Sequence, residues 1–306
     1  MRVTERVRDI LGYYDGEQPG VKASLVRLLM QGRLAGSGRM VILPVDQGFE
    51  HGPARSFAPN PAAYDPRYVF ELAIEAGLTA LAAPLGLLRA GADRYAGEIP
   101  LILKINNANS LGTVKDEAIT ATVRDATELG CSAIGFTIYP GSDRQYDMFE
   151  EIRAASAEAR AAGLAVVIWA YPRGGILEAE GETALDVVAY GAHMAALLGA
   201  HIIKVKPPSA LVFDPAARPA YEKAAIPRER LADRIAHVVQ SAFDGRRIVV
   251  FSGGAAKDDA AVLDEVRGIR DGGGYGSIVG RNAFQRNRRD ALHLLEGIVS
   301  TYLETT

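Results

Sequence analysis

The stretch MAALLGAHIIKVKPP, residues 194–208, carries the pattern that decides the fold: a helical run, a glycine and then a short apolar segment. A glycine just past a helix is its typical C-terminal cap. An apolar segment such as 200–203 is typical of a strand that is buried on both faces of a parallel sheet. The same phrase recurs, with its glycine at Gly77, Gly130, Gly163 and Gly199. The last three glycines are 33 and 36 residues apart, one βα unit each. The sequence therefore predicts a parallel sheet covered by helices.

Eight apolar segments qualify as strands. They lie within residues 40–45, 78–84, 100–105, 131–141, 164–175, 200–208, 247–251 and 277–279. Eight strands that alternate with helices over about 265 residues predict a (β/α)8 TIM barrel of the α/β class. The alternative, an open doubly wound sheet, requires a Gly-x-Gly-x-x-Gly turn after the first strand. The first strand is followed instead by DQGFEHGP, residues 46–53.

The chain divides into two predicted parts. Residues 1–38 form an N-terminal helical extension, which includes an amphipathic helix over 21–31, and residues 39–306 form the catalytic barrel. The extension is expected either to cap the bottom of the barrel or to make a subunit contact.

The amino-acid composition disfavours a nucleic acid or a membrane as the partner. The 306 residues are 48% hydrophobic, carry a net charge of −3 and intersperse both signs, so the basic footprint of a nucleic-acid or anionic-membrane binder is missing. The N-terminus has no signal-peptide pattern, and no apolar run reaches the roughly 18 residues of a membrane span. The single cysteine, Cys131, is expected in the core and cannot form an internal disulfide. These features predict a cytoplasmic protein.

Lys204 and Lys206 close one predicted strand, at the end of the barrel where function resides. Residues i and i+2 of a strand point to the same side. Burial and a neighbouring like charge both lower a lysine pKa, which a neutral amine that forms Schiff bases needs near pH 7. The alternative is that both side chains extend to solvent.

Trp169 and Tyr171 also share one side of a strand end, and Asp46 ends the first strand. The tryptophan is either core filler or a wall of the substrate site. A phenol beside two lysines is expected to have a lowered pKa and to exchange protons with a bound intermediate. The alternative for Tyr171 is a hydroxyl satisfied by the backbone.

Small residues follow the last two predicted strands, in Ser252-Gly253-Gly254 and Gly280-Arg281-Asn282. Turns at these two strands are the usual phosphate site of a TIM barrel, built from backbone N–H groups. Arg281 adds a cation suited to a phosphate. The substrate is therefore expected to be a phosphorylated small molecule.

No metal-binding pattern competes with this interpretation. The histidines at positions 51, 193, 201, 237 and 293 form no His-x-His or His-x-x-x-His pair. Only His51 lies in a glycine-rich loop at the predicted catalytic face, where a neutral imidazole suits a phosphate or hydroxyl. A Ser-His-Asp hydrolase would need a Gly-x-Ser-x-Gly elbow, which the sequence does not contain.

Five motifs together resemble one family. VDQGFEHGP from Val45, WAYPRGG from Trp169, KVK from Lys204, SGG from Ser252 and VGRN from Val279 are similar to those of the archaeal and bacterial class I fructose-1,6-bisphosphate aldolases. The resemblance implies a phosphosugar substrate, a homo-oligomer, and a Schiff base on lysine with no metal or other cofactor. It implies Lys204 as the Schiff-base lysine, Tyr171 as proton donor and acceptor, and Asp46 as a residue that orients substrate hydroxyls or exchanges protons with them. The residues it places against substrate are Gln47, Gly48, Phe49, Glu50, His51, Trp169, Ala170, Pro172, Arg173, Lys206, Ser252, Gly253, Gly254, Gly280 and Arg281.

The sequence departs from this pattern in two places. Gln47 stands where many archaeal members carry histidine, and the segment from Pro207 through Arg230 is longer than in the family, which bears on the sugar tail of the substrate. One alternative is a related Schiff-base barrel that transfers an acyl or hydroxyacetyl unit between phosphosugars, in a transaldol-type reaction. The intact Glu50-His51-Gly52-Pro53 argues against it. The other is a non-enzymatic phosphosugar-binding protein, which would bind without a covalent adduct.

Overall fold

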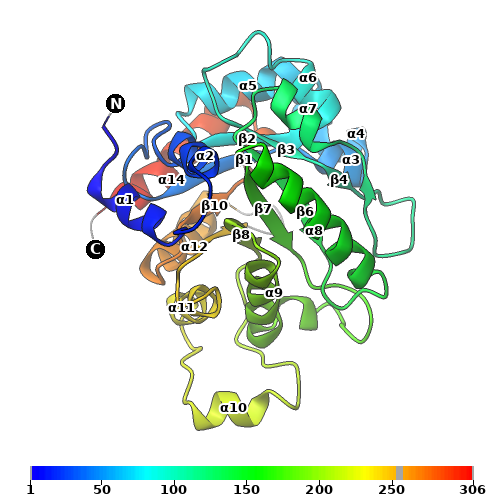
Figure 1. Cartoon of the computed structure of the whole chain (residues 1–306), viewed down its shortest axis with the longest axis vertical. Coiled ribbons are helices and arrows are strands. Elements are labelled where there is room, and N and C mark those ends of the chain that lie inside the picture. Colours follow the sequence, from blue (N-terminus) through cyan, green and yellow to red (C-terminus); the bar gives the residue numbers. More distant parts are fainter. Residues whose placement is uncertain (1, 253–257, 305–306) are drawn as a thin grey trace.

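A closed parallel barrel forms the centre of the molecule (Figure 1). The computed structural model describes residues 2–252 and 258–304, and within these ranges the strands follow the order β1-β10-β9-β8-β7-β6-β3-β2 around the barrel. They are β1 (Met40–Pro44), β2 (Ala80–Pro84), β3 (Leu101–Lys104), β6 (Ala133–Ile138), β7 (Ala165–Ala170), β8 (Ile202–Val205), β9 (Ile248–Ser252) and β10 (Gly276–Ile278). Six lie within predicted segments, and β9 and β10 each extend one residue beyond theirs, so the TIM barrel prediction is confirmed. The short pair β4 (Asn106–Asn107) and β5 (Ala118–Ile119) was not predicted, because two-residue strands leave no pattern.

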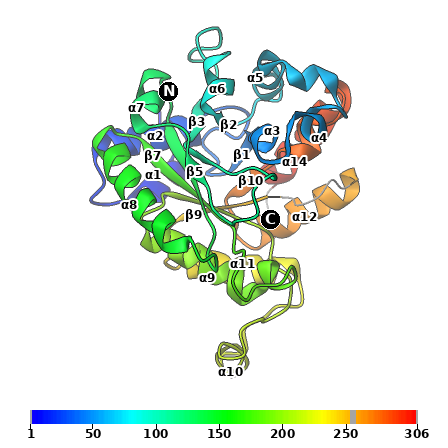
Figure 2. The same cartoon turned by 90° about the vertical axis from the view of Figure 1, so that its right-hand side faces the viewer.

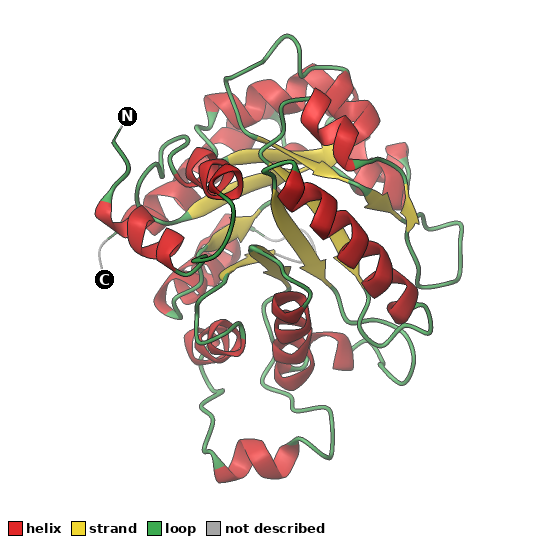
Figure 3. Cartoon of the chain, in the orientation of Figure 1, coloured by secondary structure: helices red, strands yellow, loops and turns green. Residues whose placement is uncertain are grey.

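Helices surround the barrel (Figure 3). They are α1 (Glu5–Gly12), α2 (Pro19–Leu29), α3 (Gln47–His51), α4 (Pro53–Phe57), α5 (Pro66–Glu75), α6 (Leu85–Arg89), α7 (Val123–Glu128), α8 (Gln145–Ala161), α9 (Leu185–Leu197), α10 (Arg218–Lys223), α11 (Leu231–Ser241), α12 (Asp259–Asp271), α13 (Arg281–Phe284) and α14 (Arg288–Leu303), with 3-10 turns η1 (Pro61–Tyr64) and η2 (Gly181–Thr183). The glycines of the recurring phrase have φ of 62°, 66°, 74° and 89°. Such left-handed values favour glycine and confirm the predicted helix caps.

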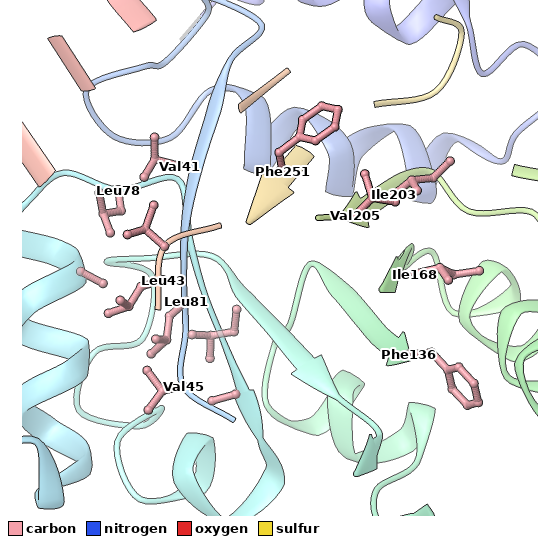
Figure 4. Close-up of a cluster of buried hydrophobic side chains, with 14 of the residues drawn as sticks. Val41, Leu43, Val45, Leu78, Leu81, Phe136, Ile168, Ile203, Val205 and Phe251 are labelled. Carbon is pink, nitrogen blue, oxygen red and sulfur yellow. The ribbon is translucent and has the colours of Figure 1, made fainter. Parts of the chain in front are cut away.

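Successive side chains along each strand point alternately outward to the helices and inward to the lumen. Outward residues such as Phe136, Ile168 and Phe251 pack under the helices (Figure 4), while inward residues such as Ile42, Val167 and Ile202 fill the lumen. Trp169 is buried in the lumen because the neighbouring strand has Gly135 beside it. A Cβ at that position would come within 2.1 Å of the indole ring. Glycine on β6 therefore makes the room that the tryptophan fills.

The N-terminal helices close the bottom of the barrel. Val7, Ile10 and Leu25 belong to the same buried cluster as the lumen residues. The Tyr14 hydroxyl donates to the carbonyl of His201 at 2.6 Å and accepts from the backbone N–H of Ile248 at 3.1 Å. These contacts support the first of the two expectations for residues 1–38, that they cap the barrel.

Two smaller expectations can be compared with the structure. Cys131 is buried, as expected of a core residue. Over the described ranges, no helix combines the length and the apolar character that crossing a bilayer requires.

His201 is expected to make stability fall in mild acid. Its Nδ1 accepts from the N–H of Val166 at 2.9 Å, and burial lowers its pKa to about 4, against the opposing influence of Glu17. Because the unfolded state protonates first, near pH 6.5, the stabilisation is complete above that pH and is lost as the pH falls toward 4. The expected loss at pH 5 is about 2 kcal/mol. His201→Asn keeps an acceptor without titrating, so urea unfolding at pH 7 and pH 5 should show a smaller difference in this variant. Equal differences in the two proteins would contradict the assignment.

Candidate active site

A cleft of about 110 Å³ lies at the C-terminal ends of the strands. The residues that line it come from the ends of β1, β7, β8, β9 and β10. They are Pro44, Gln47, Glu50, His51, Tyr171, Arg173, Lys204, Lys206, Ser252, Ile278, Gly280 and Arg281. The strand ends thus bring together residues from all five sequence motifs. Pro44 and Ile278 were not predicted, because apolar residues at a strand end look like ordinary core.

Lys204 is the buried amine of this cleft. It is 5% exposed, and its register partner on β7 is Trp169. Its Nζ lies 5.7 Å from the centre of the Trp169 ring and 5.1 Å from that of Tyr171. Burial lowers the pKa of Lys204 to about 8, with Arg173 and Arg281 adding to the effect and Asp46 and Glu50 opposing it. About a tenth of this amine is therefore neutral at pH 7, far more than for an ordinary lysine.

Lys206 lines the same cleft, as the strand alternation predicted, but its ammonium is paired. Its Nζ lies 3.1 Å from Oε2 of Glu182, in the turn η2. The largest influence on the pKa of Lys204 is burial, and the contributing cations include Arg173 and Arg281. The sequence suggested that burial and the neighbouring Lys206 would together lower the pKa of Lys204. In the structure burial is the main cause. Glu182 was missed, because it lies 24 residues from its partner in the chain.

Tyr171 departs from the sequence-based expectation. Its phenol packs against Lys204, but burial raises its pKa, and a side-chain hydrogen bond with Ser252 only partly offsets this. The prediction of a lowered pKa was wrong, because it counted the neighbouring cations and not the loss of solvent. The phenol therefore carries its proton at neutral pH.

Arg173 joins several parts of the site. Its guanidinium carbon lies 5.6 Å from the centre of the Tyr171 ring and 5.2 Å from that of Tyr139. It also pairs with Glu50 at 3.6 Å. Glu50 in turn lies 3.6 Å from the imidazole of His51. The Arg173 guanidinium and the His51 ring are therefore held beside one carboxylate.

The turn after β1 supplies the opposite wall. Asp46 precedes α3, whose Gln47 and His51 line the cleft. Gln47 Oε1 is buried and, among the described residues, accepts no hydrogen bond. Phe49 does not line the cleft and is 45% exposed. Gly48 faces the ring of Phe57, where a Cβ would come within 2.7 Å, so its role is close packing.

The ends of β9 and β10 place Ser252, Gly280 and Arg281 beside Lys204. A Cβ at Gly280 would lie 3.0 Å from the Gln47 amide and 3.1 Å from Pro44, so glycine lets the two strand ends approach. Gly253 and Gly254, which the motif also placed here, lie outside the described residues.

Three remaining predicted contacts lie away from the cleft lining. Trp169 forms the floor beneath Lys204. Ala170 belongs to the outward core, since it alternates with Trp169 along β7. Pro172 lines a separate groove on the outer face of the barrel.

Within the described ranges, no three His, Cys, Asp or Glu side chains group as ligands for a metal ion. The chemistry available at this site is that of a buried amine, a protonated phenol, a carboxylate and several cations. Such a set suits the formation of an imine on an anionic carbonyl compound.

Comparison with known proteins places the chain in a family. Residues 40–286 match the DeoC/LacD family aldolase model. The chain is 36% identical over 299 residues to a probable class 1 fructose-bisphosphate aldolase of Chlamydia trachomatis, covering 94% of this chain and 85% of that protein. It is 37% identical to the class 1 fructose-bisphosphate aldolase of Thermoproteus tenax, covering 83% and 86%.

A solved structure resembles the chain over nearly its whole length. It is an archaeal fructose-1,6-bisphosphate aldolase whose catalytic lysine is covalently bound to the carbinolamine intermediate of the substrate. The identity is 33% and the TM-score 0.76, over 91% of this chain and 98% of that one. The protein belongs to the DeoC/LacD aldolase family and, within it, to the class 1 fructose-bisphosphate aldolases.

Proposed function

We propose that this protein catalyses the reversible cleavage of fructose 1,6-bisphosphate to dihydroxyacetone phosphate and glyceraldehyde 3-phosphate, through a Schiff base on Lys204. The observation that carries the proposal is a buried lysine at the end of β8, set between two aromatic rings in a cleft with several cations. The family adds support, because a relative holds its substrate covalently on the catalytic lysine. The imine supplies the electron sink, so the reaction requires no metal or other cofactor.

The side chains account for each step. Neutral Lys204 Nζ attacks the C2 carbonyl, and loss of water from the carbinolamine leaves a protonated imine. Transfer of the C4 hydroxyl proton to a base breaks the C3–C4 bond, releases glyceraldehyde 3-phosphate and leaves an enamine. Protonation of the enamine at C3 and hydrolysis of the imine then release dihydroxyacetone phosphate and restore the amine.

Tyr171 and Asp46 divide the proton transfers in this proposal. The Tyr171 phenol lies against Lys204 and holds its proton at neutral pH, so it is ready to protonate the departing hydroxyl when the imine forms, and it takes part in closing the cycle. Asp46 stands at the end of β1 and orients substrate hydroxyls or exchanges protons with them. Gln47, with its buried amide oxygen, is available to a further hydroxyl.

The activity is tested by incubating the purified protein with fructose 1,6-bisphosphate in the presence of a chelator. We expect both triose phosphates to form without added metal. Fructose 1-phosphate, tested beside it, shows whether the second phosphate is needed. Absence of triose phosphates from a folded protein would contradict the proposed function and favour a transaldol-type reaction or simple binding.

The pH dependence of kcat/KM should follow the ionisation of the Lys204 amine. Because the neutral form attacks and the pKa of Lys204 is about 8, kcat/KM should rise about tenfold per pH unit below pH 8 and level off above it. A profile from pH 6 to 9.5 measures this directly. A flat profile between pH 6 and 8 would show that deprotonation of this lysine does not limit the reaction.

Arg281 is the proposed phosphate cation, beside Ser252 and Gly280. Loss of a charged hydrogen bond costs about 1.5–3 kcal/mol, so Arg281→Ala should raise KM and the inhibition constant of inorganic phosphate by about 10- to 100-fold. Arg289→Ala, on α14 with its side chain 91% exposed, is the matched control and should change neither. Unaltered affinity in Arg281→Ala would remove this residue from the phosphate site.

We also propose that the chain works as a homo-oligomer in the cytoplasm, in glycolysis or gluconeogenesis. Support for an oligomer comes from the outer face, where a groove of about 860 Å³ runs between α8, α9 and α11. Tyr146, Ile176 and Tyr190 line it and are 70%, 86% and 63% exposed. The segment that carries α10 projects from the body beside it (Figure 2). Light scattering coupled to gel filtration would give the subunit number, and a monomer at all concentrations would contradict the proposal.

A further inference from the structure

A second buried charge cluster lies beside the active-site cleft. Lys104, at the end of β3, is 3% exposed and Glu117 is 7% exposed. Their side chains pair at 2.7 Å. Lys104 also donates to the carbonyl of Asn106 and to its Oδ1. The Tyr139 hydroxyl donates to the other oxygen of Glu117 at 2.6 Å.

The cluster is held rigidly. The side chain of Asn106 donates to the carbonyl of Thr137 and accepts from its N–H, both at 2.8 Å. Both carboxylate oxygens of Glu117 have a partner, and the Lys104 ammonium has three. A fully paired network of this kind fixes its members in one geometry.

Stability alone does not account for this charge. Replacing a buried ion pair by apolar residues of similar size is often neutral or stabilising, because two charges no longer lose their hydration. Lys104 shares its side of β3 with Ile102, which lies in the apolar lumen. The ion pair thus stands at the lumen position nearest the cleft, where an aliphatic side chain would have continued the core.

Tyr139 connects the cluster to the reaction. The Arg173 guanidinium lies over both the Tyr139 ring, at 5.2 Å, and the Tyr171 ring, at 5.6 Å. The backbone N–H of Arg173 also bonds the carbonyl of Pro140, next to Tyr139, at 3.0 Å. A continuous series of contacts therefore runs from Glu117 through Tyr139 and Arg173 to the proposed proton carrier.

We infer that Glu117 is a positioning residue for the reaction: through Tyr139 it holds Arg173 against Tyr171, and so places the phenol for proton transfer. The inference rests on the proposed function. It assigns Lys104 the part of a counter-ion, because its ammonium is paired and enclosed. Loosening the network should slow the proton transfers that need Tyr171. The amount of imine on Lys204 at equilibrium should be unaffected, because slower proton transfer delays the imine without changing its equilibrium.

The test separates imine formation from proton transfer. With dihydroxyacetone phosphate in deuterated water, exchange of the C3 proton reports transfer between imine and enamine, and borohydride reports the imine itself. For Glu117→Gln and Tyr139→Phe we expect exchange and kcat to fall about tenfold, a modest share of the effect of general acid–base catalysis. The trapped imine and KM should stay within about twofold of wild type. The double variant should lose no more than either single variant, since both act through one series of contacts.

Tyr302→Phe is the matched control, because it removes a buried hydroxyl that bonds Ser277 at 2.6 Å outside the cleft lining. It should leave exchange unaltered. A parallel fall in imine, exchange and kcat in the two cluster variants would indicate a purely structural role and overturn the inference. Wild-type exchange in Tyr139→Phe would overturn it as well, even if Glu117→Gln does not fold. Failure of the proposed function is distinguishable, since wild type itself would then form no triose phosphates from fructose 1,6-bisphosphate.

Discussion

Lys204→Met is expected to abolish aldol cleavage, with a loss on the order of 10⁴- to 10⁶-fold, because removal of a covalent nucleophile leaves no route to the imine. The fold should survive. Lys204 is 5% exposed and lies between two aromatic rings, so an unbranched apolar side chain fills the same space without the cost of burying a charge. Steady-state cleavage tests the loss of activity, and thermal unfolding of the same preparation tests the retention of the fold.

Two other lysines at strand ends serve as controls for this result. Lys206 is paired with Glu182 and Lys104 with Glu117, so the side-chain nitrogen of each already has a carboxylate partner. Lys206→Met should therefore keep the ability to form the imine even if substrate affinity falls. Appreciable turnover by Lys204→Met would mean that one of these lysines is the nucleophile.

Tyr171→Phe is expected to lower kcat by about 10²- to 10³-fold, the range for loss of a general acid–base group. The variant keeps the ring that packs against Lys204 and loses only the hydroxyl that bonds Ser252. It should still form an adduct that borohydride can trap. Comparison of the amount of trapped adduct with kcat separates an effect on the imine from an effect on proton transfer.

The control for this variant is Tyr95→Phe, which removes a hydroxyl that donates to Glu71 at 2.8 Å, away from the cleft. Its turnover should match wild type. Wild-type turnover in Tyr171→Phe would exclude this phenol from proton transfer, and loss of the adduct together with turnover would place it in imine formation alone.

The barrel could be predicted because four of its βα units repeat the same helix, glycine cap and apolar strand. A glycine cap needs a left-handed φ, and the strand after it is apolar on both faces, as at Gly163 and Gly199. Strand alternation then correctly placed Lys204 and Lys206 on one side, in one cleft. Alternation also separates Trp169 from Ala170, which the family resemblance had grouped as one substrate-binding segment.

The electrostatics of the site could be predicted only in part: the lowered pKa of Lys204 was expected, and the raised pKa of Tyr171 was not. The pKa of Tyr171 depends on how completely the barrel excludes water, and sequence neighbours carry no such information. The partners of the cations come from distant parts of the chain: Glu182 in η2 pairs with Lys206, and Glu50 in α3 pairs with Arg173. The ion pair between Lys104 and Glu117 joins β3 to the connection between β4 and β5, which leaves no periodic pattern.

Borohydride trapping with dihydroxyacetone phosphate is the decisive test of the Schiff base on Lys204. The experiment uses metal-free buffer with a chelator, followed by mass spectrometry of the peptides. We expect a reduced adduct on Lys204 in wild type and none in Lys204→Met. A folded wild-type protein with no adduct on any lysine, or with its adduct on Lys104 or Lys206, would contradict it.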